Sequence, residues 1–347
     1  MSIGTTDQEA VDDPIEYFIT DMEFQGKSER TRDAYERVLR EFENQLLNDP
    51  TSPNSIAQAT PRDCMSWIHT VRQEGSESTV ATYTSYLHRF FSYMTQVGAF
   101  QDNPMAIVVE QIDESIDTNP ARREISLDQM RAFVQSIGHP LDRAVIVTLL
   151  KTGMRAGELC NLDIRDIHFT NDFIDRDGPL HPHIQEKPDS LLISPDPSRG
   201  TEYNGEVRTA SNKRRRQTVV PIDPELKREL VRWLLIRPDP RSGAEPLFTS
   251  TDRWGKRVTL HMVHHIVERH AREFDWYRTG GGSEENVTPH YFRHFFTTHL
   301  RDATGDRGIV KYLRGDVADD IIDTYTHNWG NRVRDVYDDN IYSLFHI

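Results

Sequence analysis

The sequence predicts a mainly α-helical protein with a small antiparallel β-sheet, divided into two domains. Three observations support this prediction. Apolar residues recur at helical spacing along most of the chain, short apolar pieces broken by Pro, Gly and Asp occupy residues 164–220, and 347 residues exceed the usual length of one domain. Residues 112–124 are polar and acidic and contain the breaker Asn119-Pro120, so we place the linker between the domains there.

The first domain is predicted to cover residues 13–111 as a bundle of four or five helices. An apolar stripe at helical spacing marks its first helix, which begins at Pro14. Thr60 and Pro61 are residue types preferred at an N-cap and at the first helical position, so they mark the start of another helix. Residues 1–12 are expected to be disordered.

The second domain is predicted to cover residues 125–347 and to end in a C-terminal helix. Residues 141–150 are almost continuously apolar, which favours a buried core helix, whereas the pieces at 191–194 and 218–220 indicate the antiparallel sheet. Residues 172–205, rich in Pro and Asp, are expected to form a surface insertion. Further helices are expected over residues 225–236, 260–274, 290–301, 307–313, 319–324 and 331–344.

The net charge of -14 has the wrong sign for a simple nucleic-acid binder, because phosphate contacts require Lys and Arg. The positive charge is clustered, however, at Arg208 and at residues 213–216, and a local basic cleft can coexist with an acidic surface. The acidic composition and the preference for Arg over Lys resemble those of proteins from salt-loving archaea. We therefore expect a halophilic protein.

The chain has only two cysteines, Cys64 and Cys160, and neither has a Cys or His neighbour at the spacing of metal ligands. This argues against a disulfide framework and against a zinc site. No stretch of 18 or more apolar residues is present, and no signal peptide is readable. We expect a cytoplasmic protein with no membrane segment.

The first motif, at residues 152–159, places Arg155 in a turn flanked by Gly153 and Gly157, before Glu158. The planar Arg side chain presents several donors that match a phosphate, so a turn of this kind can hold a phosphodiester. The simpler interpretation is a surface Arg that only caps the preceding helix.

The second motif, at residues 288–300, begins with Thr and Pro and places His290 and Arg293 three residues apart in the first turn of a helix. Both side chains would face the same ligand, and an anion there also gains from the positive end of the helix. His294 and His299 are interpreted as ordinary packing or surface residues.

Two further positions have simple alternatives. Tyr325 follows a short predicted helix, but it is one of twelve tyrosines, which are more often packing residues than nucleophiles. Lys213 lies in a basic segment for which a solvated hairpin, or a patch that contacts the DNA backbone, is the simpler explanation. A Lys at the tip of such a hairpin could also protonate a leaving hydroxyl group.

The order of these segments resembles that of the tyrosine recombinase, or phage integrase, family over most of residues 124–330. The N-terminal bundle is similar to the SAM-like core-binding domain of that family, and the second domain to its α+β catalytic domain. The resemblance implies that the catalytic positions are Arg155, Lys213, His290, Arg293 and Tyr325. It also implies that Glu158 supports Arg155.

On this resemblance, the expected function is site-specific DNA recombination or integration. Tyr325 would attack a DNA phosphate and form a 3′-phosphotyrosine, while the two arginines stabilise the transition state and Lys213 protonates the leaving oxygen. No metal or other cofactor is required. The expected partner is double-stranded DNA, bound by a homotetramer on two sites that is a monomer or dimer in solution.

Two parts of the sequence depart from the family pattern. Gly315 is followed by Asp316, where the family usually has His or Trp, and an ionised Asp cannot donate to a phosphate. Either Arg314 supplies that contact or the reaction is slower. The stretch from Arg155 to Lys213 is also longer than a plain hairpin. The proton-donor role assigned to Lys213 could therefore belong instead to Arg214, Arg215 or Arg216. The expected DNA-backbone contacts are Arg208, Arg214, Arg215 and Arg216.

Two alternatives remain at this point, a type IB topoisomerase-like enzyme and a catalytically weak or silent DNA-binding regulator on the same fold. The C-terminal helix also allows two arrangements, because its apolar side at residues 332–345 could dock on a neighbouring protomer or pack on its own core.

Overall fold

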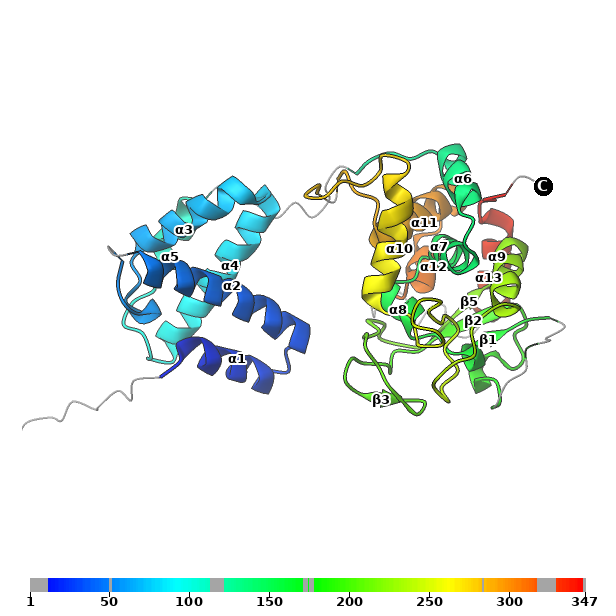
Figure 1. Ribbon diagram of the computed structural model, residues 1–347, viewed down its shortest axis with the longest axis horizontal. Helices are drawn as coiled ribbons and strands as arrows, with labels where there is room; N and C mark the ends of the chain where they lie inside the picture. The colour runs from blue at the N-terminus through cyan, green and yellow to red at the C-terminus, as the bar shows by residue number, and fades with distance from the viewer. Residues whose placement is uncertain are drawn as a thin grey trace, which may run out of the picture. The chain divides into compact units, whose positions relative to one another are not determined.

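The computed structural model divides the chain into two compact units, Met1–Pro120 and Ala121–Ile347, which are described separately (Figure 1). The structure describes residues 12–49, 52–112, 122–170, 174, 178–282, 284–316 and 329–345. None of the described helices is long and apolar enough to cross a membrane.

The first unit is a bundle of helices (Figure 1). Its apolar side chains form a core of their own. Thr60 is the N-cap of α3, as the sequence indicated, and it forms a reciprocal capping box with Asp63. Trp67 and Phe42 pack edge to face within the core, and Ile15 is fully buried. The helices of this unit are α1 (Pro14–Phe24), α2 (Glu29–Asn48), α3 (Pro61–Glu74), α4 (Glu77–Gln96) and α5 (Met105–Glu110), with a short 3-10 turn at Ile56–Gln58.

The second unit is built around α7, whose residues are almost all buried, and which packs between α9 and α11. This confirms the buried core helix that the apolar run predicted. The helices of this unit are α6 (Leu127–Ser136), α7 (Pro140–Thr152), α8 (Ala156–Cys160), α9 (Pro224–Leu234), α10 (Leu260–Arg272), α11 (Pro289–Thr304), α12 (Arg307–Arg314) and α13 (Trp329–Asn340). The predicted helix at 319–324 lies outside the described residues.

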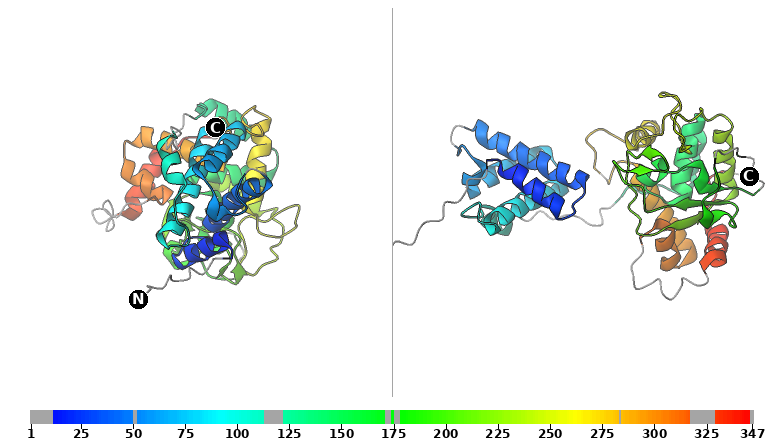
Figure 2. Two further views of the ribbon diagram at one scale, coloured as in Figure 1. Left: turned by 90° about the vertical axis from the view of Figure 1, so that its left-hand side faces the viewer. Right: turned by 90° about the horizontal axis from the view of Figure 1, so that it is seen from below.

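The predicted antiparallel sheet is present in this unit. Its order is β1 (Ile167–His168), β2 (Ser190–Ile193) and β5 (Thr218–Pro221), with Leu191 opposite Val220. The long connection from β2 to β5 contains a separate hairpin, formed by β3 (Glu202–Tyr203) and β4 (Glu206–Val207). Both α12 and α13 pack against β5, and Figure 2 shows them, in orange and red, close together in this unit.

The C-terminal segment packs on the core of its own unit in this structure. Tyr337 of α13 is fully buried and donates its hydroxyl to the carbonyl of Lys151 at 2.8 Å. Beyond α13, Leu344 is also buried, and its backbone N–H donates to a carboxylate oxygen of Glu225 at 2.8 Å. Of the two arrangements considered for this helix, the single chain adopts the one within its own core.

Candidate active site

Arg155 is positioned by the turn between α7 and α8. Gly153 ends α7 in the left-handed region, with φ of 60°, and Arg155 is the N-cap of α8. The backbone N–H of Arg155 donates to one oxygen of Glu158 at 2.9 Å, and its Nη1 donates to the other at 3.1 Å. Glu158 is completely buried. The carboxylate therefore holds both the backbone and the guanidinium of Arg155, and the catalytic supporting role of Glu158 stays a prediction.

Arg293 reaches the same place from the first turns of α11. Its side chain is buried, and its Nη1 donates to the carbonyl oxygen of Gly153 at 2.7 Å. Burial and the neighbouring charge of Arg155 lower the pKa of Arg293 to about 10, so the side chain remains charged at neutral pH. Two arginines that are distant in the sequence thus meet at one turn.

The carboxylate of Asp316 binds both Arg155 and Arg293. One oxygen accepts from Nη2 of Arg155 at 2.7 Å, and the other accepts from Nη2 of Arg293 at 2.7 Å. Nη2 of Arg314 lies 2.8 Å from the second oxygen. Although burial opposes ionisation, the charges of Arg293, Arg314 and Arg155 hold the pKa of Asp316 below its usual value. The carboxylate is therefore ionised at neutral pH.

His290 lies one helical turn from His294 on α11, and their Nε2 atoms are 3.0 Å apart. Partial burial and the positive charges of Arg122 and Arg293 lower the pKa of His290. Burial and the charge of Arg122 lower the pKa of His294 to about 4. Both rings are neutral at neutral pH, so one donates and the other accepts. His294, which the sequence suggested was an ordinary packing residue, is in direct contact with the candidate catalytic His290.

Lys213 is exposed, and the residues on both sides of it are anchored. The Asn212 side chain donates to the carbonyl oxygen of Ser194 at 2.7 Å and accepts from Nδ2 of Asn161 at 2.9 Å. Arg214 is buried, with Nη1 donating to the carbonyl oxygen of Leu313 at 3.0 Å. Within the described part of the chain, the Lys213 ammonium group makes no hydrogen bond or ion pair. Its backbone is fixed while its side chain remains available.

Arg214 also contacts Glu158, with 3.2 Å between Nη2 and a carboxylate oxygen. Its guanidinium thus joins the carboxylate that holds Arg155 to the end of α12. Since its side chain is completely shielded from solvent, its position does not fit the expected DNA contact, nor does it let Arg214 compete with Lys213. Arg215 is exposed and Arg216 is half-buried, so both remain predicted DNA contacts.

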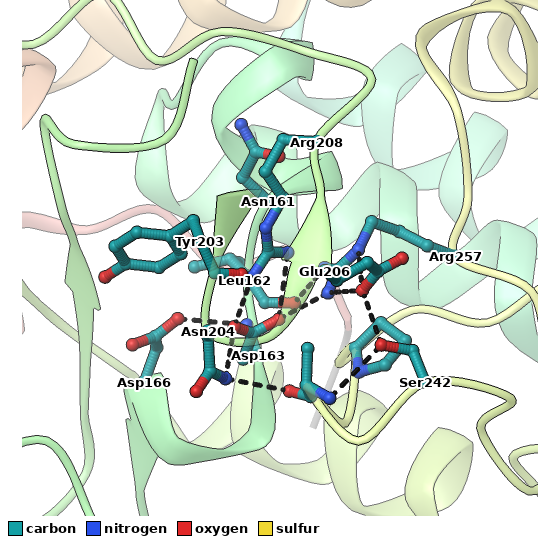
Figure 3. A network of polar contacts seen from close by, with 12 residues as sticks. Asn161, Leu162, Asp163, Asp166, Tyr203, Asn204, Glu206, Arg208, Ser242 and Arg257 are labelled. Carbon is teal, nitrogen blue, oxygen red and sulfur yellow. Dashed lines mark hydrogen bonds and ion pairs between the residues drawn. The ribbon is translucent and has the colours of Figure 1, made fainter. Parts of the chain in front are cut away.

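Arg208 is likewise buried, in a polar network that ties the β3–β4 hairpin to the rest of the unit (Figure 3). Its Nη2 donates to Asp163 at 2.6 Å, and Nη2 of Arg257 donates to the other oxygen of that carboxylate at 2.6 Å. Arg257 also reaches Glu206 at 2.6 Å, and Asn204 donates to Asp163 at 2.9 Å. A DNA contact by Arg208 does not fit this position, because its guanidinium is enclosed and bound to Asp163.

Tyr325, the predicted nucleophile, lies outside the described residues. The structure brings Arg155, Arg293, Arg314 and Asp316 together, with Glu158 behind them. Among the described residues, no three His, Cys, Asp or Glu side chains are grouped so as to hold a metal ion. The absence of a metal or cofactor stays a prediction.

The comparisons with known proteins agree with this arrangement. Residues 15–98 match the phage integrase N-terminal SAM-like domain, and residues 201–332 match the phage integrase family. The tyrosine recombinase XerD of Listeria monocytogenes serotype 4b is 28% identical over 335 residues, which cover 94% of this chain and 96% of that protein. The tyrosine recombinase XerC of Thermodesulfovibrio yellowstonii is 24% identical, and the alignment covers 90% of each chain.

Solved structures share the fold. The Tn1549 transposon integrase in complex with transposon right end DNA aligns with a TM-score of 0.62 at 19% identity, covering 93% of this chain and 97% of that one. A lambda integrase dimer bound to a core site aligns with a TM-score of 0.59 at 15% identity, covering 89% and 96%.

A helical domain followed by a catalytic domain with clustered arginines defines a class of DNA strand-transfer enzymes. The chain belongs to the phage integrase family of tyrosine recombinases. The comparisons do not favour the topoisomerase-like enzyme or the silent regulator. A haloarchaeal source and adaptation to salt stay predictions, as does the cytoplasmic location.

Proposed function

We propose that this chain is a site-specific DNA recombinase that cleaves and rejoins DNA through a 3′-phosphotyrosine on Tyr325. The meeting of Arg155 and Arg293 at one anion position is the observation that carries the proposal. Attack by the tyrosyl oxygen on the DNA phosphorus releases a 5′-hydroxyl, and attack by a 5′-hydroxyl reverses the step. The energy of the phosphodiester bond is kept in the covalent intermediate, so no nucleotide triphosphate is consumed.

The two guanidinium groups would stabilise the negative charge that develops on the phosphate oxygens in the transition state. Arg293 is buried and hydrogen-bonded to Gly153, and Arg155 is held by Glu158, so both are positioned before DNA binds. Preorganised donors avoid the cost of reorganisation during the reaction, which makes this arrangement suitable for phosphoryl transfer.

His290 would accept the proton of the Tyr325 hydroxyl. Its neutral state at neutral pH supports this role, because a protonated imidazole has no free nitrogen to accept a proton. The contact with His294 would hold the ring of His290 in a defined orientation.

Lys213 would donate a proton to the leaving 5′ oxygen. Among residues 213–216 it is the cation whose side chain is exposed without a contact to another described residue, whereas Arg214 is enclosed in the protein. Arg215 and Arg216 would contact the DNA backbone beside it.

The proposed substrate is double-stranded DNA, bound by four copies of the chain on two recombination sites. A structurally similar lambda integrase has been solved as a tetramer bound to a Holliday junction, at 16% identity and a TM-score of 0.59. In the absence of DNA we expect a monomer or dimer. The mass of the protein in solution, measured alone and with its DNA site, tests this part of the proposal.

The catalytic proposal is tested with a suicide DNA substrate that carries a nick beside the cleavage point, so that religation is prevented. The wild-type protein should form a covalent complex that survives denaturation, and Tyr325→Phe should form none. The control is Tyr277→Phe, a half-buried tyrosine of the same unit, which should retain the complex. Equal trapping by wild type and Tyr325→Phe, or no trapping by wild type on its cognate site, would contradict the proposal.

A further inference from the structure

The strongest unexplained feature is the carboxylate of Asp316, which receives three arginines at once. Its Oδ1 accepts from Arg155 at 2.7 Å, while its Oδ2 lies 2.7 Å from Arg293 and 2.8 Å from Arg314. Both oxygens are therefore used, and each is bound by the terminal nitrogen of a guanidinium group. Arg155 is the N-cap of α8, and Arg293 and Arg314 lie in α11 and α12, so the carboxylate joins three separate parts of the unit.

This geometry is that of an anion bound by several arginines. We call the site formed by Arg155, Arg293 and Arg314 the arginine cradle. A phosphodiester presents two equivalent oxygens that share one negative charge, and so does a carboxylate. Guanidinium groups bind both by the same paired N–H donors. Arg155 and Arg293 are the groups assigned above to the DNA phosphate, so Asp316 holds the donors that the substrate requires.

We infer that Asp316 occupies the position of the DNA phosphate in the free protein and must leave it when DNA binds. The inference rests on the proposed function for the identity of the natural ligand. Asp316 thus controls how tightly this site binds its substrate anion, because any anion that enters must compete with an internal one.

The Asp316 carboxylate and a DNA phosphate cannot both occupy the cradle without a large unfavourable free energy. Both would be ionised, and repulsion between like charges at contact distance is strong where solvent is partly excluded. The side chain of Asp316 is 31% exposed, so rotation about its own torsions brings the carboxylate into water. Arg293 is almost completely buried and cannot follow it, so the cradle remains in place.

The charges around the cradle predict what removal of Asp316 does. Arg155, Arg293, Arg314 and Arg214 are positive, and Glu158 and Asp316 are the carboxylates that contact them among the described residues. Removing Asp316 leaves one carboxylate for four arginines. The cradle then has a larger positive potential and no internal occupant, and both effects strengthen anion binding.

The experiment measures the affinity of the full chain for inorganic phosphate by calorimetry at neutral pH and constant ionic strength. Asp316→Asn should bind phosphate about tenfold more tightly than the wild type, since a charge at contact distance in a partly exposed site has an effect of that order. The control Asp302→Asn makes the same charge change at an exposed position on α11 and should leave the affinity unchanged.

Two further variants locate the effect. Asp316→Glu keeps the charge and should retain the weak binding of the wild type, which separates the loss of charge from a general disturbance of the site. Arg293→Ala in the Asp316→Asn background should remove the gain, because the bound anion loses a buried donor. If Asp316→Asn does not fold, Asp316→Ser provides the same comparison.

Equal or weaker phosphate binding by the folded Asp316→Asn variant would overturn the inference and would instead indicate that Asp316 only orients the arginines. This result is distinguishable from failure of the proposed function. Phosphate affinity does not depend on Tyr325, whereas covalent trapping of DNA does. If the wild type forms the covalent DNA complex but Asp316→Asn does not bind phosphate more tightly, the proposed recombinase function stands. The inference that Asp316 occupies the phosphate position is then wrong.

Discussion

Asp166 is a buried carboxylate without a cation bound to it in the described structure. One oxygen accepts the backbone N–H of Asp163 at 3.0 Å, and the other has no hydrogen-bond partner among the described residues (Figure 3). Burial and the nearby charge of Asp163 raise the pKa of Asp166 to about 7. At neutral pH this residue is therefore close to its titration midpoint, unlike an ordinary surface carboxylate.

Asp166→Asn should stabilise the protein above pH 7 and change little near pH 4. The pKa of Asp166 is raised in the folded state from 3.8, so its favourable contribution is complete below about pH 4 and is lost as the pH rises to about 7. Asn keeps the acceptor for Asp163 and carries no charge. The free energy of unfolding, measured in urea across this range, should differ by on the order of 4 kcal/mol at pH 8, because a pKa difference of one between the folded and unfolded states corresponds to about 1.4 kcal/mol.

The exposed Asp302→Asn variant is the control for this measurement, and its difference from the wild type should not grow with pH between 4 and 8. A constant difference for Asp166→Asn across the range would show that Asp166 does not titrate there.

At the scale of elements, the turn between α7 and α8 determines where the arginines meet. Gly153 has φ of 60°, and a Cβ at this position would lie 2.3 Å from the ring of Phe296 on α11. Glycine is thus required both by the backbone conformation and by the close approach of the two helices. Since the carbonyl of Gly153 accepts from Arg293, the same approach positions a candidate catalytic side chain.

Gly153→Ala should lower the free energy of unfolding by roughly 2–4 kcal/mol, because a left-handed alanine is strained and Phe296 must move. Covalent trapping of the nicked DNA should fall as well. The matched control is Gly305→Ala at the end of α11, where φ is 65° and a Cβ meets no atom within 4 Å. Gly305→Ala should lower the free energy of unfolding by only about 1–2 kcal/mol. A similar loss for both variants would mean that the contact with Phe296 has no effect.

At the scale of the whole second unit, a buried cation joins the C-terminal segment to the core. Nζ of Lys151 lies 2.6 Å from Asp223 and 2.7 Å from Glu225, and it donates to the carbonyl oxygen of Tyr342 at 2.6 Å. The Lys151 side chain is completely buried at the end of α7. Glu225 in turn binds the backbone N–H of Leu344, so one network holds α7, α9 and the last described residues.

Lys151→Met should destabilise this unit by about 3–5 kcal/mol, because Asp223 and Glu225 would remain buried without their cation. Chemical unfolding measures the loss, and proteolysis should release the C-terminal segment earlier than in the wild type. Lys227→Met, which removes a half-exposed pair with Asp189, should cost less than about 1 kcal/mol. Equal costs would indicate that the Lys151 network does not stabilise the unit.

Much of the fold could be predicted from the sequence because its signals are local. The capping residue Thr60 marks a helix start, and the apolar run at 141–150 marks the core helix. The hairpin formed by β3 and β4 could not be predicted in the same way. Asn204 and Arg208, in and directly after this hairpin, bind Asp163 from 41 and 45 residues away, and no periodic pattern in the sequence predicts such pairs.

In the candidate site, too, residues within local motifs could be predicted, whereas contacts that depend on tertiary structure could not. Arg155 and Arg293 could be predicted because each lies in a motif with its own turn or helix start, and the structure brings both side chains to Asp316. Arg208 and Arg214 could not be interpreted correctly, because a basic run looks the same whether its side chains face solvent or a buried carboxylate. The contact of Asp316 with three arginines also depends on tertiary structure, although its departure from the family pattern was visible.

The anchoring of Asn212 and Arg214 has a consequence for the proton donation that we propose for Lys213. A lysine on an unrestrained loop would have to order its backbone as well as its side chain before each transfer, and every ordered residue carries an entropic cost. Here the backbone on both sides of Lys213 is already immobilised, so only the rotations of one side chain remain to be restricted. The ammonium group therefore reaches the leaving oxygen by changing side-chain conformation alone.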